Sequence, residues 1–243
     1  MSNSSTRELY VTPAQRIETY PIDRSVKHLI IDGNVFVEDL LLDYRRCRTL
    51  ENILSTAKSL TILHLTRSAC YFENAIEMEV FFHAMLDMRA VKRISITKFT
   101  LPDSRYPPDT PVCVTTYGRI PIRKFHVDTT HGASLSFLLN CFEPQKLSLS
   151  WCEFVDYLPE CDRLSLSRIT PSEGLLDILV EWNGSELTID NCSFLDKDFV
   201  RELKRVMVDT DEPIWPNAKV LFVGYSYTVC QRIYEMVDLR SQL

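Results

Sequence analysis

The chain has few of the features that mark nucleotide-binding or metal-binding proteins. Only 6 of its 243 residues are glycine, which excludes the glycine-rich loop that cradles phosphate groups. Its 8 cysteines include no C-x-x-C pair, and the spacing of Cys141, Cys152 and Cys161 fits no standard set of zinc ligands. We therefore expect no cofactor, and we interpret the cysteines as reduced side chains packed in the core.

The chain also lacks the marks of a secreted, membrane or nucleic-acid-binding protein. No apolar run approaches the roughly 18 residues of a membrane span, and Glu38 and Asp39 interrupt one of the most hydrophobic stretches, residues 35–42. The first ten residues are polar and do not resemble a signal peptide. The net charge of -6 argues against a nucleic-acid footprint or a polybasic membrane anchor. These features predict an intracellular protein, cytoplasmic or nuclear, that binds another protein.

The chain does contain a short recurring sequence pattern, in which a polar residue precedes two aliphatic residues separated by one position. Eight segments fit, and their alternation is typical of short strands with one buried face. A hydrophobic content of 45% is enough to fill a sizeable core behind them. The first core positions of the eight strands are Leu29, Leu63, Ile94, Phe125, Leu147, Leu164, Leu187 and Leu221.

Segments with apolar residues at helical spacing lie between most of these strands: residues 37–54, 80–88, 198–208 and 229–237. A strand followed by a helix about every 27 residues is typical of a leucine-rich-repeat-like solenoid. The predicted fold is α/β, with an in-order parallel sheet and helices on its convex side. Residues 1–20 are expected to be a flexible N-terminal arm and residues 21–243 a single domain. The short step from Leu147 to Leu164 leaves no room for a full helix and predicts an irregular loop.

The sequence also indicates how the turns after the strands are stabilised and where one loop lies. Leucine-rich repeats place an Asn or Cys after the second core leucine, where its side chain ties the turn together. Cys152, Asn191 or Cys192 are the residues that we expect in this role. Residues 101–118 contain four prolines, which predict an exposed loop.

Three segments in the C-terminal half carry a family resemblance. They are residues 169–179, residues 183–194, and residues 198–204 with their closing Leu203-Lys204 pair. Together they resemble the F-box-associated (type 2) region of the large nematode F-box families, which is itself leucine-rich-repeat-like. The resemblance implies a substrate-recruiting subunit of a ubiquitin ligase. No F-box pattern for binding the ligase adaptor is visible in residues 1–60, so the resemblance implies the substrate-binding half alone.

The residues that alternate with the core positions predict a small, polar strand face. We expect a protein partner to bind on this face, which would be the concave side of the solenoid. Its candidate contact residues are His28, Asp32, His64, Thr66, Ser95, Thr97, His126, Asp128, Ser148, Ser150, Ser165, Ser167, Thr188 and Asp190, with Ile30 among them.

An enzyme with an α/β core is the alternative interpretation. His126 and Asp128 could act with a neighbouring strand-face serine such as Ser148 in hydrolase-like chemistry. No G-x-S-x-G motif is present. His64 and His126 lie two strands apart, so their backbones would be roughly 10 Å from each other, which does not favour a shared metal. We therefore expect neither catalysis nor a metal site. An enclosed cavity around His126 would favour the enzyme, and an open face would favour the binding module.

The three tryptophans could either cover the core or stack on a ligand. Trp151, Trp182 and Trp215 fall at the ends of expected strands or helices. A large ring at such a position more often covers the core than stacks on a ligand. We therefore expect all three rings to cap the core.

Overall fold

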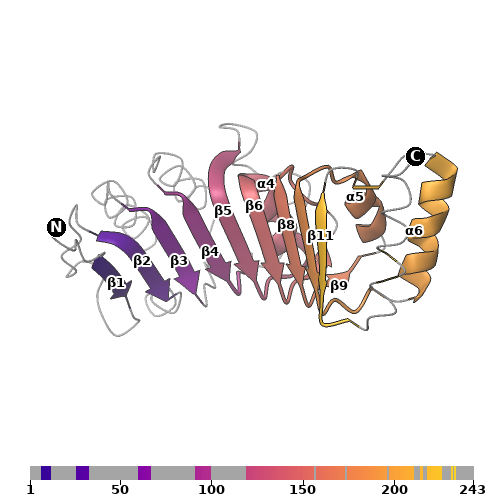
Figure 1. Ribbon diagram of the computed structural model, residues 1–243. Helices are drawn as coiled ribbons and strands as arrows, with labels where there is room; N and C mark the ends of the chain where they lie inside the picture. Colours follow the sequence, from indigo (N-terminus) through magenta and orange to yellow (C-terminus); the bar gives the residue numbers. More distant parts are fainter. Residues whose placement is uncertain are drawn as a thin grey trace.

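The computed structural model describes residues 7–11, 26–32, 60–66, 91–99, 119–155, 157–172, 174–195, 197–210, 214–215, 218–225, 231 and 233. Over these residues the chain is an α/β protein with one open parallel sheet of nine strands (Figure 1). In sheet order the strands are β1 (Arg7–Val11), β2 (Val26–Asp32), β3 (Ile62–Thr66), β4 (Arg93–Thr97), β5 (Ile120–Asp128), β6 (Phe142–Ser150), β8 (Arg163–Ser167), β10 (Glu186–Asp190) and β11 (Lys219–Val223).

The strands follow one another in the sheet as they do in the sequence, and every neighbouring pair is parallel. The predicted in-order parallel sheet is therefore confirmed. A second, two-stranded parallel sheet pairs β7 (Glu153–Val155) with β9 (Thr170–Pro171). The sequence did not predict this small sheet, because its strands are too short to show alternation.

One strand lies where the sequence predicts only a flexible arm. Residues Arg7–Val11 form β1, which pairs in parallel with β2 at the edge of the sheet. This part of the expected arm therefore belongs to the sheet. The rest of residues 1–20 lies outside the described part of the chain.

Alternation of buried and partly exposed residues explains why these segments are strands. In β8, Leu164 and Leu166 are buried, whereas Ser165 and Ser167 between and after them remain partly exposed. The first core positions of neighbouring strands pair directly, as Leu147 does with Leu164. Equivalent core side chains therefore stack in a continuous row behind the sheet.

The last strand departs from the prediction by one residue. Leu187 of β10 pairs with Val220 and not with Leu221, which is 48% exposed. Phe222 takes the second core position and is 9% exposed. The expected core position at Leu221 is therefore wrong. The reason is that β11 has apolar residues at four successive positions, so hydrophobic alternation does not determine which of them face inward.

In the nine-stranded sheet, each strand from β4 onward is followed by one residue with a left-handed backbone. These residues are Lys98, Thr129, Trp151, Arg168 and Asn191, with φ between 48° and 58°, and Gly224, with φ of 79°. The backbone N–H groups of the first five extend the ladder of the sheet, as Trp151 does by donating to the carbonyl of Ser167 at 2.9 Å. The following residue then points into the core, as the buried Cys152 does after Trp151.

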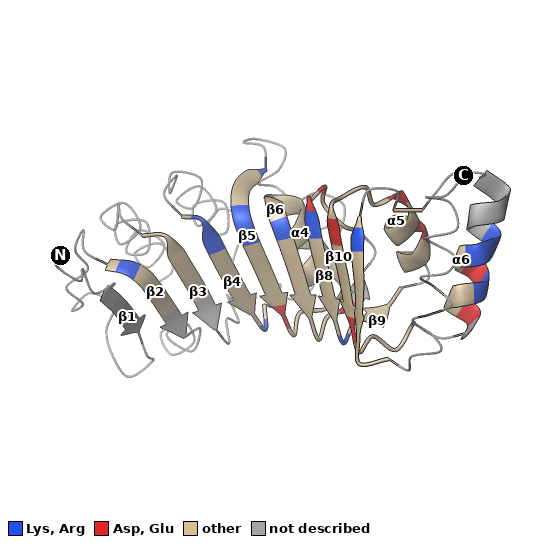
Figure 2. Cartoon of the chain, viewed as in Figure 1, with Lys and Arg blue, Asp and Glu red and all other residues tan. Residues whose placement is uncertain are grey.

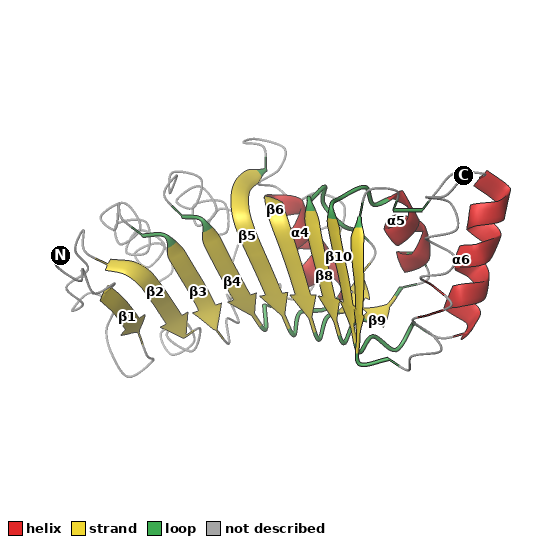
Figure 3. Ribbon diagram, in the orientation of Figure 1, coloured by secondary structure: helices red, strands yellow, loops and turns green. Residues whose placement is uncertain are grey.

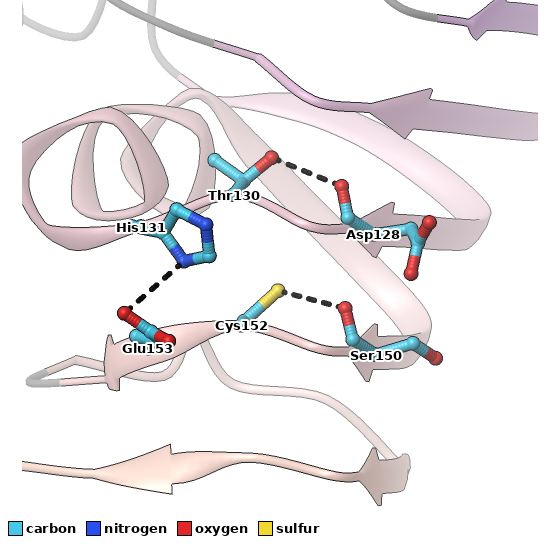
Figure 4. A network of polar contacts seen from close by, with 6 residues as sticks. All are labelled: Asp128, Thr130, His131, Ser150, Cys152 and Glu153. Carbon is cyan, nitrogen blue, oxygen red and sulfur yellow. Dashed lines mark hydrogen bonds and ion pairs between the residues drawn. The ribbon is translucent and has the colours of Figure 1, made fainter.

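Buried hydroxyl and thiol groups stabilise these turns (Figure 4). The Cys152 thiol lies 3.4 Å from the carbonyl oxygen of Ser150 and 3.7 Å from that of Val127. Thr130 occupies the equivalent position one strand earlier, and its hydroxyl donates to the carbonyl of Asp128 at 3.3 Å. Cys152 therefore has the turn-stabilising role that the sequence predicts, and Thr130 is a member of the same series that the sequence did not reveal.

Cys192 continues the series, and its thiol lies 3.5 Å from the carbonyl oxygens of both Asp190 and Leu166. Asn191, the other candidate, is exposed and holds the left-handed position. The expectation for Asn191 is therefore wrong, because the inward-facing position comes one residue later. The cysteines that the structure describes are reduced and form no disulfide, in agreement with the prediction: Cys141, Cys152, Cys161 and Cys192.

The helices lie on the side of the sheet that carries the core (Figures 1 and 3). They are α4 (Gly132–Cys141), α5 (Leu175–Glu181) and α6 (Lys197–Thr210). The amphipathic pattern of residues 198–208 correctly predicted α6. Helix α4 was not predicted, because buried residues such as Leu135, Phe137 and Leu138 give it no clear apolar stripe.

Several other expectations fall largely or wholly on undescribed residues. The helices expected at residues 37–54 and 80–88 and the loop at 101–118 lie outside the described part of the chain. The same holds for the helix at 229–237, apart from Gln231 and Ile233. The described residues between Leu149 and Leu164 contain β7 but no helix, as expected from the short step. Where the chain is described, none of its helices has the length and apolar character to cross a membrane.

Candidate functional site

The open face of the sheet carries two aligned rows of side chains, and most of them are predicted contact residues. The middle row follows the register from β2 to β11 and consists of Ile30, His64, Ser95, His126, Ser148, Ser165, Thr188 and Leu221. The carboxyl-end row lies two residues further along the strands and consists of Thr97, Asp128, Ser150, Ser167, Asp190 and Val223.

Apart from the last member of each row, the side chains described in both rows are half-buried. They alternate along each strand with the buried core residues and therefore lie on the side of the sheet opposite to the core. The helices lie on the core side (Figure 1). Two predicted contact residues, Asp32 and Thr66, pair in register with each other, but their side chains lie outside the described part of the chain. The structure thus brings most of the predicted residues together on one continuous face.

His28 is displaced from the middle row, because it pairs with Ile62 while His64 pairs with Ile30. The rings of His28 and His64 nevertheless meet edge to face, with their centroids 4.8 Å apart. The sequence predicted the offset along the strands but not this contact. Among the described residues, no group of three or more His, Cys, Asp or Glu side chains is arranged to hold a metal ion.

The carboxylates of the carboxyl-end row make local hydrogen bonds. Asp190 accepts one from the Ser167 hydroxyl at 2.9 Å and one from the Asn191 side-chain amide at 2.7 Å. Asp128 accepts one from the Thr129 hydroxyl at 3.2 Å. These bonds satisfy part of the hydrogen-bonding capacity of the two carboxylates.

His126 lies at the centre of the middle row, beside Ser148. Burial lowers the pKa of His126 below its usual value, although the negative charge of Asp128 acts in the opposite direction. The ring is therefore neutral at neutral pH. In the described part of the chain, no hydrogen bond joins the His126 ring to the Ser148 hydroxyl or to the Asp128 carboxylate, so the three do not form the contacts of a catalytic triad.

Trp151 and Arg168 form an exposed pair that the sequence did not predict. Trp151 is 53% exposed, and the guanidinium carbon of Arg168 lies 4.4 Å from the centre of its ring. The expectation that Trp151 caps the core is wrong, because its left-handed backbone turns the ring away from the core. Trp182 and Trp215 are buried, as predicted.

A row of cations is the second feature that the sequence did not reveal. The basic row comprises Arg93, Lys124, Lys146 and Arg163, which pair in register across four adjacent strands. It lies two residues before the middle row on the same face. Figure 2 shows basic segments at matching positions on β4, β5, β6 and β8. The available signal was a basic residue directly before the first core position in four successive strands.

A hollow of about 1010 Å³ lies away from the predicted contact residues. Its lining includes Pro121, Arg123, Glu143 and Pro144 from the amino-terminal parts of β5 and β6, together with Trp182 after α5. His126, Asp128 and the strand-face serines are not among its lining residues. The hollow therefore does not enclose the residues of the hydrolase-like alternative.

Comparisons with known proteins do not add a relative to this description. No protein-family model matches the chain, and no curated protein or solved structure matches it significantly.

Proposed function

We propose that the chain is a protein-interaction module that binds a polypeptide partner on the open face of its sheet. The observation that carries this proposal is the alignment of the middle row over eight strands, from Ile30 to Leu221, on the side opposite to the helices. A continuous row in which most side chains are polar suits an extended partner that crosses several strands.

Two finer assignments belong to the same proposal. The first is that the sheet and its helices form a leucine-rich-repeat-like solenoid. The left-handed turns support it, because they recur at the same place in successive units from β4 to β11. The inward-facing Thr130, Cys152 and Cys192 support it as well, because they take equivalent positions after β5, β6 and β10. The second is that the module recruits substrates to a ubiquitin ligase, and it rests only on the resemblance to the F-box-associated family.

The hydrolase-like alternative receives less support. A serine hydrolase needs a serine, a base and an acid in hydrogen-bond contact, close to a pocket for its substrate. His126, Ser148 and Asp128 lack such contacts in the described structure, and the hollow near Pro121 and Trp182 does not reach them. The observed geometry favours binding over catalysis.

The test is co-purification of the tagged chain with its partner from cells that express it. Bulky or charged substitutions replace five face residues together: His64, Thr97, His126, Ser148 and Ser165. A matched control carries five substitutions of exposed residues away from this face: Glu181, Asp198, Arg201, Lys204 and Arg205. We expect the face variant to lose a specific partner and the control to retain it. Circular dichroism should show that both variants are folded.

A photo-crosslinking amino acid locates the contact directly. Placed at Ser165, it is expected to crosslink the same partner, whereas at Arg201 on α6 it is not. If the partner remains bound after all five face substitutions, the open face is not the binding surface. Residues 101–118, which the sequence predicts to be an exposed loop, then become the leading candidate.

A further inference from the structure

The basic row places four positive charges in a line on an otherwise acidic chain. Neighbouring strands of a sheet are about 4.8 Å apart, so the row from Arg93 to Arg163 extends about 14 Å across the strands. Like charges at this spacing repel one another and reduce the stability of the sheet. The four positive charges therefore lie side by side in a chain whose net charge is -6.

Among the residues that the structure describes, few carboxylates neutralise this charge. At one end of the row, Arg163 lies 3.4 Å from a carboxylate oxygen of Glu186 and 3.5 Å from one of Asp162. Within the described part of the chain, Arg93, Lys124 and Lys146 make no ion pair. The positive charge of Arg93 is the main cause that lowers the pKa of Lys124, followed by burial and by the charge of Lys146.

The shape and limits of the row restrict what kind of anion fits it. An extended polypeptide advances about 3.3 Å per residue, so four or five residues would cover the row. The row ends at Glu186, the register partner of Arg163, and Asp128 and Asp190 lie toward the carboxyl ends of the strands. Toward the amino ends, Glu143 and Asp162 lie near the cations Lys92 and Arg123. A nucleic-acid duplex or a membrane surface is wider than the row and would bring its phosphates against these carboxylates.

The middle row adds hydrogen-bonding groups beside the charges. Ser95, His126, Ser148 and Ser165 each lie two residues beyond a member of the basic row, a distance of about 6.6 Å along the strands. A segment lying along the basic row therefore meets cations on one side and hydroxyl or imidazole groups on the other. This arrangement suits carboxylate side chains, which accept several hydrogen bonds.

We propose that the basic row binds an extended polypeptide segment of the partner that carries several Asp and Glu side chains within about five residues. This inference rests on the proposed function and specifies the chemistry of the partner. Charge complementarity supplies attraction and orientation, and the flanking acidic residues exclude broader polyanions.

The test is fluorescence anisotropy with the full chain and labelled synthetic peptides. The probe is Gly-Glu-Asp-Glu-Asp-Glu-Gly, and its neutral analogue is Gly-Gln-Asn-Gln-Asn-Gln-Gly. The variant combines Arg93→Gln, Lys124→Gln and Lys146→Gln. The matched control combines Arg201→Gln, Lys204→Gln and Arg205→Gln on α6, which removes the same charge from a distant surface. A single-stranded oligonucleotide and anionic lipid vesicles serve as competing probes.

We expect the acidic peptide to bind more tightly than its neutral analogue and to weaken as salt rises. The variant in the basic row is expected to bind it at least about tenfold more weakly, whereas the α6 control stays within about twofold. Equal binding by the basic-row variant, or no preference over the neutral peptide, would overturn the proposal. Tighter binding of the oligonucleotide or the vesicles would overturn it as well.

Failure of this proposal is distinguishable from failure of the proposed function. If the peptide does not bind but the face variant still loses its partner on co-purification, the face binds a protein of another chemistry. If the peptide binds and the face variant retains its partner, the acidic segment binds independently of that partner.

Discussion

Phe222 of β11 lies directly beside Ile189 of β10, and its side chain packs into the core while that of Leu221 faces outward. Both residues are large and apolar, and only the pairing with β10 distinguishes them. The open face consequently ends in two exposed apolar side chains, Leu221 and Val223, next to Thr188 and Asp190.

This pairing predicts unequal costs of truncation in the last strand. Phe222→Ala should lower the free energy of unfolding by about 3 kcal/mol, because it removes a buried ring and leaves a cavity. Leu221→Ala should change it by no more than about 0.5 kcal/mol, because the side chain is already half exposed. Urea denaturation followed by circular dichroism measures both. A larger loss for Leu221→Ala would show that the register of β11 is wrong by one residue.

Strands β6 and β8 allow the same comparison between a buried leucine and the serine that precedes it. Leu149 is fully buried, and Leu149→Ala should cost about 2 to 5 kcal/mol. Ser148 faces the opposite side, so Ser148→Ala should cost less than about 1 kcal/mol. Leu166→Ala and Ser165→Ala provide an independent pair in β8. If thermal denaturation ranked either pair in reverse, the assignment of the open face would be incorrect.

A side chain at Gly224 is expected to lower the stability of the protein. Its φ is 79°, and an added Cβ would lie 2.1 Å from the side-chain oxygen of Asn191. Even if Asn191 moves away, Gly224→Ala should cost about 1 to 2 kcal/mol through backbone strain. Gly174→Ala is the matched control, because Gly174 has no positive φ and no atom within 4 Å of the added Cβ. Equal melting temperatures for the two variants would contradict this account of the turn.

The thiol of Cys152 should make stability depend on pH in alkaline solution. Burial raises its pKa from 9.0 to about 11, so the folded state favours the neutral thiol. The stabilisation is complete below about pH 9 and is lost as the pH rises toward 11, by an amount on the order of 2 kcal/mol. Urea denaturation of the unmodified chain and of Cys152→Ala at pH 7.5 and pH 10.5 measures it. The difference between the two proteins should shrink at the higher pH, and a constant difference would exclude titration of this thiol.

His126 should produce the opposite dependence on the acidic side. Its pKa in the folded state is lowered, mainly by burial, so the folded state favours the neutral ring. Its contribution is present above the unfolded pKa of about 6.5 and is lost as the pH falls below it. The unfolding free energy should therefore drop more steeply between pH 7 and pH 5 in the unmodified chain than in His126→Gln. NMR titration of the imidazole measures the pKa directly, and a value above 6.5 would contradict the effect of burial.

The amino-acid sequence by itself predicted eight of the nine strands of the main sheet and the order in which they pair, but not β1 or the two-stranded sheet of β7 and β9. Leucines alternate with serines in β6 and β8, so each of these strands has one apolar face that packs into the core. The leucines are Leu147, Leu149, Leu164 and Leu166. Helix α6 was equally visible, because its apolar residues recur at helical spacing. These features depend on neighbours within one segment, which a sequence displays directly.

Only the tertiary structure decided features that depend on contacts between strands. The inward position of Phe222, the contact between His28 and His64, and the outward turn of Trp151 all follow from register or from a left-handed backbone. The basic row is of the same kind. Lys124 and Lys146 are 22 residues apart in the chain, yet they are adjacent in the sheet because their strands pair in parallel. Side-chain alternation specifies a face within each strand, whereas the alignment of successive strands decides which charges meet on it.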